Sequence, residues 1–267
     1  MTVLTPGGVA VVTGGASGIG WGITRALHAQ GLRVEVVDRD PRRLEEAADQ
    51  LPIGVHALDV TDPDALRALA ARLTEEHGGV DVLVNNAGVG PAASIVDTTL
   101  KDWRWILDVN LMGVIHGIDA FLPGMLRRGT PAHVVNTASM SAFDPIAGLG
   151  AYAASKAAVA ALTDALVAEL EGTPVGVSLL VPANVRTNIA ETSAALRPAT
   201  GSGFGDYRPV APPTGIHWRT PEDVGELVVE GIRADRQILV THPEQWPRVA
   251  ERQRRIREAF GRDAIES

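Results

Sequence analysis

Three residues near the middle of the chain have the types and the spacing of a proton-transfer site. Tyr152 and Lys156 form a Tyr-x-x-x-Lys sequence, which places the two side chains one turn apart on the same face of a helix. Ser139 lies thirteen residues before Tyr152, directly after the apolar run 133–138. A phenol beside an ammonium group and near a hydroxyl can move a proton to and from an alcohol. Because this spacing also occurs by chance in helices, the prediction depends on the elements around it.

Asn110 stands within an apolar stretch, L-D-V-N-L-M-G-V, in a region that reads as mostly helical from 100 to 128. A buried asparagine must find hydrogen-bond partners. It could be a polar core residue that bends the helix, or it could hold a water molecule beside a reactive site. The presence of Ser139, Tyr152 and Lys156 favours the second interpretation.

A glycine-rich sequence near the N-terminus, T-G-G-A-S-G-I-G, has the features of a phosphate-binding turn. It follows an apolar β-branched run, 9–13, and precedes a helical pattern over about 18–30. Gly14 and Gly18 permit positive φ and close approach of the backbone, and Ser17 can cap a helix whose N-terminal amides face an anion. A plain tight turn is the alternative, but the position between a strand and a helix favours phosphate binding.

Asp38 ends the next apolar run, 32–37, and lies 18 residues after Gly20. An acid about 20 residues past such a turn binds the two hydroxyls of an adenosine ribose and repels a 2′-phosphate, which favours NAD over NADP. Arg39 follows directly and could offset part of that repulsion. Asp38 could also cap the helix that starts at Pro41.

Strand and helix patterns alternate along the rest of the chain. This alternation predicts an α/β fold, a Rossmann-type doubly wound parallel sheet of about seven strands with helices on both faces. The glycine turn, Asp38, Asp59, the N-N-A-G sequence at 85–88, Ser139 and Pro182 all follow strands, where ligands of such sheets bind. No linker or repeat divides the chain, so we expect a single domain over 1–267. The expected strands after Asp38 are 54–58, 80–84, 133–138, 175–181 and 237–241, and the later helices are 62–77, 151–171 and 221–234.

Composition limits the possible functions. The chain has 267 residues, and its formal net charge of −8 argues against nucleic-acid binding. It has no cysteine, which excludes disulfides, thiolate nucleophiles and Cys-built metal sites. No two of the seven histidines are four residues apart, so we expect no metal site. The N-terminal residues show no signal-peptide pattern, and no apolar run approaches the roughly 18 residues of a membrane span. We therefore expect a cytoplasmic protein with no membrane partner.

These motifs together resemble those of the short-chain dehydrogenase/reductase family, in its single-domain branch. T-G-G-A-S-G-I-G, N-N-A-G, Asn110, Ser139 and Tyr152-x-x-x-Lys156 match the family's markers in order, over about residues 8–241. The resemblance implies a catalytic set of Asn110, Ser139, Tyr152 and Lys156. It implies a cofactor site formed by Gly14, Ser17, Gly18, Ile19, Gly20, Asp38, Arg39, Asp59, Val60, Asn86, Ala87, Gly88, Tyr152, Lys156, Pro182, Val185 and Thr187. One departure is Pro182-Ala183, where the family usually has Pro-Gly.

The expected reaction interconverts a secondary alcohol and a ketone with NAD. Tyr152 is the proposed general base for oxidation and acid for reduction, Lys156 favours its phenolate, Ser139 orients the substrate oxygen, and Asn110 holds a water. An NADP-dependent carbonyl reductase is the alternative, and a non-catalytic dinucleotide sensor or scaffold is a third reading of the same fold.

Less can be predicted about the substrate. A Gly- and Pro-rich segment, about 183–220, could be a substrate lid or a mobile surface loop. We expect Ser139, Met140, Phe143, Tyr152 and Ala183 at the substrate, with Ile146 nearby, in a largely apolar pocket. The run P-A-N-V-R-T-N-I-A-E followed by L-R-P is similar to the Cα-dehydrogenases of lignin-derived aryl ethers, which suggests a bulky aryl alcohol. Polyol, steroid and acyl-thioester ketone substrates remain alternatives.

The resemblance also implies a homotetramer or homodimer built on the helices at about 100–128 and 151–171. The second of these has a face of small residues that permits close packing. The tail from about 243 to 267 is charged, and we expect it to be a solvated helix that frays at its end.

Overall fold

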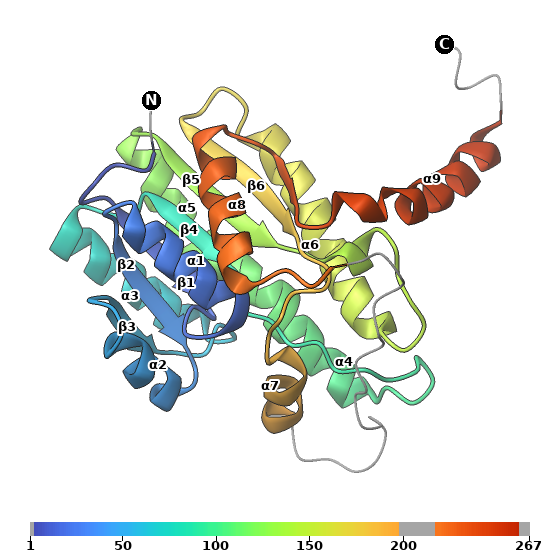
Figure 1. Ribbon diagram of the computed structural model, residues 1–267. Coiled ribbons are helices and arrows are strands. Elements are labelled where there is room, and N and C mark those ends of the chain that lie inside the picture. Colours follow the sequence, from blue (N-terminus) through green and yellow to red (C-terminus); the bar gives the residue numbers. More distant parts are fainter. Residues whose placement is uncertain (1–2, 198–216, 262–267) are drawn as a thin grey trace.

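The computed structural model describes residues 3–197 and 217–261, and every structural statement below concerns these residues (Figure 1). The part of the expected lid from 198 to 216, and the end of the tail from 262, lie outside them. At the centre is one parallel sheet in the order β3-β2-β1-β4-β5-β6-β7. Its strands are β1 (Val9–Thr13), β2 (Arg33–Asp38), β3 (Gly54–Ala57), β4 (Val82–Asn85), β5 (Ala132–Thr137), β6 (Val175–Val181) and β7 (Ile238–Val240).

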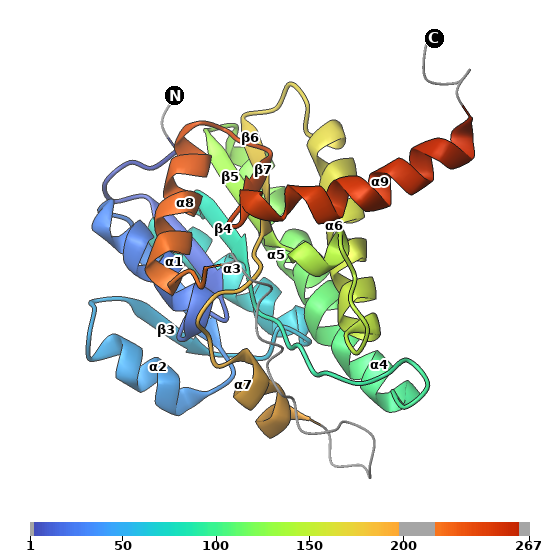
Figure 2. The same ribbon diagram turned by 45° about the vertical axis from the view of Figure 1, so that its right-hand side comes forward.

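Helices follow the strands and cover both faces of the sheet, as Figures 1 and 2 show. Besides three short helical turns, they are α1 (Gly18–Ala29), α2 (Pro41–Ala48), α3 (Pro63–His77), α4 (Leu100–Leu107), α5 (Gly113–Arg128), α6 (Gly150–Glu169), α7 (Ile189–Leu196), α8 (Pro221–Arg233) and α9 (Trp246–Phe260). The chain adds β2 and β3 on one side of β1 and then returns to add β4, β5, β6 and β7 on the other side. The topological switch point therefore lies between β1 and β4. The predicted doubly wound fold is confirmed.

The period-two alternation of the strands builds a separate core on each face. In β1, Ala10 and Val12 join the cluster formed with α1 and α8, whereas Val9 and Val11 join the cluster formed with α3, α5 and α6. Because every residue of β1 is buried, the strand reads as a continuous apolar run. The consequence for function is that the ends of the central strands are held rigidly between two layers of helices.

Two predicted elements differ from those observed. The stretch predicted as one helix over 100–128 is divided, because a five-residue π-helical turn, Asp108–Met112, separates α4 from α5. The segment after Pro182 was predicted as irregular, but it contains the helix α7. The Ser193 hydroxyl donates a hydrogen bond to the carbonyl oxygen of Ile189 in this helix. The tail is a regular helix, α9, as far as Phe260.

Two helical stretches, 100–128 and Gly150–Glu169, are long and apolar enough to cross a membrane by length and composition. In this fold their apolar residues pack on the sheet: α5 and α6 contribute Phe121, Met125 and Leu166 to the core beneath them. The apolar composition of both stretches is therefore explained by the core that they form.

Candidate active site

The glycine turn shapes one end of a cleft at the carboxyl ends of the strands. Gly14 and Gly18 adopt φ angles of 61° and 50°, which disfavour any other residue. A Cβ atom on Gly20 would lie 2.0 Å from the Gly14 carbonyl oxygen, so the first turn of α1 packs directly on the loop. Ser17 occupies the N-cap position of α1, but its hydroxyl does not cap the helix, and the first turn of α1 has no acidic residue. The N-terminal amides of α1 are therefore open to an anion.

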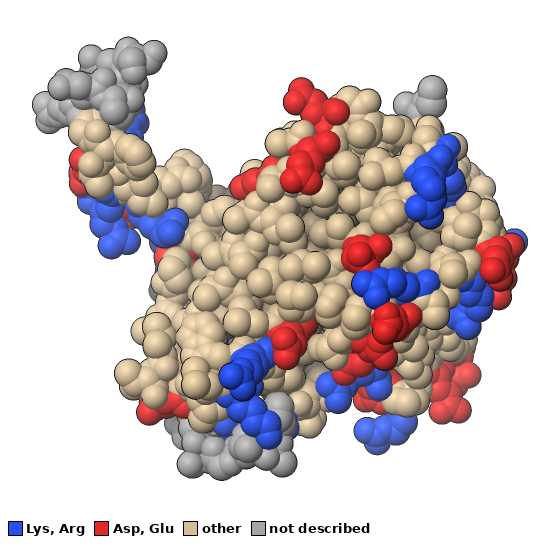
Figure 3. Space-filling model, turned by 180° about the vertical axis from the view of Figure 1, so that it is seen from behind, with Lys and Arg blue, Asp and Glu red and all other residues tan. Residues whose placement is uncertain are grey.

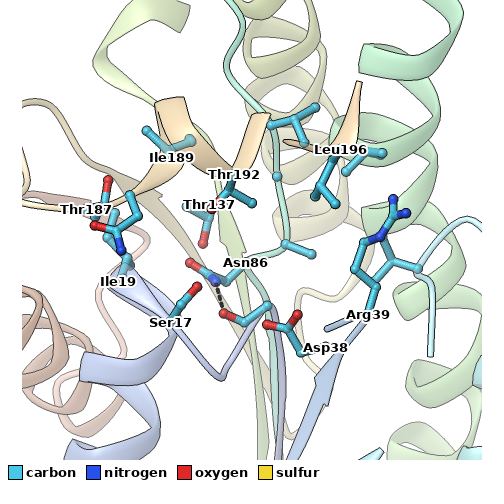
Figure 4. A pocket seen from close by; sticks show the side chains of 18 of the residues that line it. Ser17, Ile19, Asp38, Arg39, Asn86, Thr137, Thr187, Ile189, Thr192 and Leu196 are labelled. Atoms are coloured by element: carbon cyan, nitrogen blue, oxygen red, sulfur yellow. Dashed lines mark hydrogen bonds between the residues drawn. The ribbon is translucent and has the colours of Figure 1, made fainter. Parts of the chain in front are cut away.

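Asp38 lies at the end of β2 and faces this cleft (Figure 4). Burial raises the pKa of its carboxyl above the usual value, although the backbone amides of Asp40 and Ala16 partly oppose this by donating hydrogen bonds to the carboxylate. Asp40, rather than Asp38, caps α2, because its carboxylate accepts a hydrogen bond from the backbone amide of Arg42. The alternative reading of Asp38 as that cap was wrong.

Arg39 and Asp59 close the same end of the cleft from two neighbouring strands. Their side chains form an ion pair of 3.5 Å. The positive charge of Arg39, the residue after Asp38, is therefore paired with the carboxylate of Asp59. Ile19 and Val60 line the cleft as well.

The N-N-A-G sequence after β4 fixes the floor of the cleft. Asn86 donates hydrogen bonds from its side-chain amide to the carbonyl oxygens of Thr13 (3.0 Å) and Gly14 (3.3 Å), which ties the floor to the glycine turn. Ala87 and Gly88 follow in the lining. A Cβ atom on Gly88 would lie 3.4 Å from Lys156 Nζ, so the loop passes close to the predicted proton-transfer pair.

Tyr152 and Lys156 both line the cleft, on the first turns of α6. Lys156 Nζ lies 6.0 Å from the centroid of the Tyr152 ring and donates a hydrogen bond of 2.9 Å to the carbonyl oxygen of Thr137. The Lys156 side chain is buried, and burial lowers its pKa to about 8. At pH 7 the group is still mainly protonated, so the cleft holds a buried positive charge one helical turn from a phenol.

Asn110 lies at the centre of the π-helical turn and is fully buried. Its side-chain oxygen accepts a hydrogen bond from the Val89 amide (2.8 Å), and its nitrogen donates to the Val89 carbonyl oxygen (2.8 Å) and to Ser155 Oγ (3.0 Å). The side chain therefore joins the loop after β4 to α6. It does not line the cleft, and its predicted water-holding role stays a prediction.

Ser139 and three of the other predicted substrate residues are not in the lining of this cleft. Ser139 is buried at the end of β5, and its hydroxyl accepts a hydrogen bond from the Ser141 amide. Met140, Phe143 and Ala183 belong to one apolar cluster with Val249 from α9. Of the predicted substrate residues, only Tyr152 is in the lining of the cleft.

The segment after β6 supplies two of the three predicted cofactor residues to the cleft. Pro182 and Thr187 line it, and Thr187 lies against the glycine turn, since a Cβ atom on Gly18 would be 3.2 Å from the Thr187 side chain. Val185 instead lies in the core on the α1 side and pairs with Arg219 in an isolated β-bridge.

Sequence reasoning missed the helix that covers the cleft. Ile189, Thr192 and Leu196 of α7 line the cleft opposite Asp38 and Asn86 (Figure 4). Arg43 of α2 spans the opening, because one of its nitrogens lies 3.1 Å from Ser17 Oγ and 3.2 Å from Thr192 Oγ1. The only signal in the sequence was Arg43 itself, a basic residue in the first turn of α2, which starts beside the cleft. Its position does not reveal the contact with Thr192, which is 149 residues away in the sequence.

The observed residues fit a dinucleotide. The glycine turn leaves a cradle that side chains would fill, the amides of α1 face it, and Asp38 stands at one end with Lys156 at the other. Within residues 3–197 and 217–261, no group of three or more His, Asp and Glu side chains is arranged to hold a metal ion.

Comparisons with known proteins agree with this geometry. Residues 8–197 match the family model of the short chain dehydrogenase. A C alpha-dehydrogenase from Sphingobium sp. (strain SYK-6) is 35% identical over 247 residues, which cover 88% of this chain and 81% of that protein. The crystal structure of a short chain dehydrogenase/reductase from Burkholderia phymatum in complex with NAD has a TM-score of 0.85 and 33% identity, with 95% of each chain covered.

The probable oxidoreductase EphD of Mycobacterium tuberculosis is 34% identical over 242 residues, which cover 88% of this chain. The chain spans only 41% of the length of that relative. The predicted resemblance to the Cα-dehydrogenases is confirmed by the Sphingobium protein. The chain therefore belongs to the short-chain dehydrogenase family.

Proposed function

We propose that this enzyme uses NAD to interconvert a secondary alcohol and a ketone, and that the substrate is bulky and apolar or aryl. The observation that carries the proposal is the buried ammonium of Lys156, one helical turn from the Tyr152 phenol, in a cleft that has Asp38 at its other end. Burying a lysine costs free energy of folding, so a buried lysine in a cleft points to a function. The pKa values of Lys156 and Asp38 are both shifted by burial, and two such groups in one cleft are typical of a reactive site.

The residues that would hold the dinucleotide follow from their positions in the cleft. The glycine turn and the amides of α1 would bind the pyrophosphate, Asp38 the adenosine ribose, and Asp59 and Val60 would border the adenine. Lys156, Pro182 and Thr187 would lie toward the nicotinamide. The bound nicotinamide supplies the hydride chemistry, accepting hydride from the alcohol carbon or returning it to the ketone.

The chain's own residues handle the proton. In oxidation, Tyr152 as phenolate accepts the hydroxyl proton of the substrate while hydride leaves its carbon; in reduction, the phenol returns that proton to the carbonyl oxygen. The charge of Lys156 favours the phenolate, since an ammonium nearby stabilises the anionic form. We assign the orientation of the substrate oxygen to Ser139, whose hydroxyl would exchange its partner Ser141 for the substrate.

Two features of the ribose pocket support NAD rather than NADP. The Asp38 carboxylate would repel a 2′-phosphate, and the neighbouring Arg39 is engaged by Asp59. Arg43 is the basis of the alternative, an NADP-dependent carbonyl reductase, because its guanidinium lies in the lining of the same cleft.

The substrate class is supported by the apolar side chains of α7 at the cleft and by the Sphingobium relative named a C alpha-dehydrogenase. Ile189, Leu196 and Val109 would present a largely apolar surface to a ligand. Such a surface favours burial of an aromatic ring, worth about 2 kcal/mol for a large apolar group.

The test is a screen of secondary alcohols, aryl and non-aryl, with NAD and with NADP, followed through the absorbance of the reduced nicotinamide. We expect turnover of aryl secondary alcohols with NAD. Faster turnover with NADP would overturn the cofactor assignment, and turnover confined to polyols or acyl thioesters would overturn the substrate class.

A further inference from the structure

The C-terminal helix α9 projects from the body of the protein as an arm. The helix begins at Trp246, and Figures 1 and 2 show its far end well away from the helices that flank the sheet. Residues 251–260 are all exposed, and Val249 is the one buried residue of the helix. A helix of 15 residues is marginally stable by itself in water, so a partner surface is expected to stabilise it.

One side of the arm has the pattern of a helix that packs against another surface. Trp246, Val249, Gln253, Ile256 and Phe260 recur at steps of three and four residues. Of these, Val249 packs into the body, whereas Trp246, Ile256 and Phe260 are 58%, 45% and 73% exposed. The apolar side thus starts in the body's own core and continues without cover.

The root of the arm is fixed, so the exposed part cannot fold back freely. Arg248 forms an ion pair of 2.6 Å with Asp144, and Val249 packs in the cluster that contains Met140 and Phe143. With its first turn held in this way, the apolar side is left largely uncovered by the described residues 3–197 and 217–261.

The charges of the arm and the body are opposite. The arm has five arginines and two glutamates, a formal charge of +3, so the rest of this chain of net charge −8 carries −11. Glu251 and Glu258 both pair with Arg254. Arg252, Arg255 and Arg257 form no ion pair with any other residue in the described ranges. Figure 3 shows blue side chains on the arm.

We propose that α9 docks on the body of a second copy of this chain, which returns its own arm in the same way. The acidic body of a second copy matches the basic arm in charge, and a two-fold exchange closes the assembly. Two arms packed only on each other would place +3 beside +3, so the contact is arm to body. An anionic membrane is disfavoured as the partner, because residues 1–245, with a formal charge of −10, would be repelled from it.

The first experiment measures the molar mass of the full chain by size-exclusion chromatography with light scattering. We expect an assembly of two or more copies whose mass falls by half or more in the double variant Ile256→Gln/Phe260→Gln. Because both residues are exposed, the variant should fold, and circular dichroism checks this. The matched control is Ile95→Gln/Val96→Gln, which removes two exposed apolar side chains outside the arm and should leave the mass unchanged.

The second experiment uses the absence of cysteine from the chain. Gln253→Cys introduces a single thiol on the apolar side of the arm, to which a benzophenone maleimide is attached. Illumination should join two chains, with the crosslinked peptide in the body of the partner. The same label on Glu75→Cys, an exposed position in α3, should give none.

Three results would overturn the proposal: a monomeric wild-type chain, a mass that the arm variant leaves unchanged, or crosslinking from the label at position 253 to the partner's arm alone. Binding of the wild-type monomer to vesicles of phosphatidylcholine and phosphatidylserine, lost in the arm variant, would assign the arm to a membrane surface instead. None of these measurements depends on the substrate or on NAD, so this proposal and the proposed function can fail separately.

Discussion

Arg197, at the end of α7, donates two hydrogen bonds, of 3.1 and 3.2 Å, to the carboxylate of Asp102 in α4. Asp102 is 0% exposed. Burial alone would raise the pKa of this carboxyl, but the hydrogen bonds from Arg197 and Thr99 outweigh burial and hold the pKa below its usual value. The pair therefore ties the helix that covers the cleft to the neighbouring layer.

We expect Arg197→Met to destabilise the fold by about 3 kcal/mol, because it leaves a buried carboxylate without its partner. The double variant Asp102→Asn/Arg197→Gln should regain most of that stability, since no buried charge is left unpaired. Both should release bound NADH about tenfold faster than wild type, because α7 loses its tie to α4. Stopped-flow fluorescence measures the release and urea denaturation the stability.

Arg67→Met is the matched control for this pair. It removes solvent-exposed ion pairs to Asp64 and Asp119, which contribute little to stability, and should leave NADH release unchanged. Wild-type release rates in the double variant would show that the pair serves stability alone.

Tyr152→Phe removes the hydroxyl that is proposed to exchange the proton and keeps the ring. We expect turnover to fall by about 10³ or more, within the range of general acid–base catalysis, with dinucleotide affinity changed less than threefold. Turnover is followed with an alcohol identified in the screen, and affinity by quenching of tryptophan fluorescence. Near-normal turnover in a variant that binds NAD normally would exclude Tyr152 as the acid–base.

Asp38→Asn keeps the size of the side chain and removes its charge. Loss of the repulsion toward a 2′-phosphate should raise the ratio of NADP to NAD turnover by about tenfold. The effect should shrink at high salt, because the cleft end is partly exposed. An unchanged cofactor ratio would mean that another residue, such as Arg43, decides the choice.

Lys156 should make the ligand-free protein less stable below pH 8. Its pKa falls from 10.5 in the unfolded chain to about 8 in the folded protein, so the unfolded state binds more protons between these values. Stability should therefore rise with pH from about 8 to 10.5, by up to about 3 kcal/mol. Lys156→Met should stabilise the protein at pH 7 by about 2 kcal/mol, allowing for the lost hydrogen bond to Thr137, and this gain should vanish above pH 10.

The chain's other lysine, Lys101, is exposed and supplies the control. Lys101→Met should leave the dependence of stability on pH unchanged, as measured by urea denaturation. A Lys156→Met variant that is less stable than wild type at pH 7 would show that the hydrogen bond to Thr137 outweighs the cost of the buried charge.

The fold could be predicted because its causes are local in the sequence. Each apolar run such as 9–13 is followed by residues that turn the chain, and the caps of α2, α3 and α8 stand directly before Pro41, Pro63 and Pro221. The same local logic located the cleft, since residues that follow parallel strands must meet at one edge of the sheet.

What could not be predicted depends on contacts between distant parts of the chain. Arg43 meets Thr192, and Arg197 meets Asp102, across 149 and 95 residues. The helix α7 has no strong periodic pattern, so its position follows from these contacts and from the bond between the Gly90 amide and Ser193. The placement of Met140, Phe143 and Ala183 at the substrate stays a prediction, and their packing with Val249 is a contact that sequence spacing does not reveal.

The π-helical turn Asp108–Met112 also limits how the chain can change in length. Such a turn contains one residue more than an α-helical turn would. Deleting Leu111 would therefore restore an unbroken helix through 100–128 and rotate every later side chain of α5 by about 100° relative to α4. Phe121 and Met125 would leave the core, or Asn110 would lose Val89. The number of residues in this turn, more than the identity of any one of them, therefore sets how the side chains of α5 are rotated relative to those of α4.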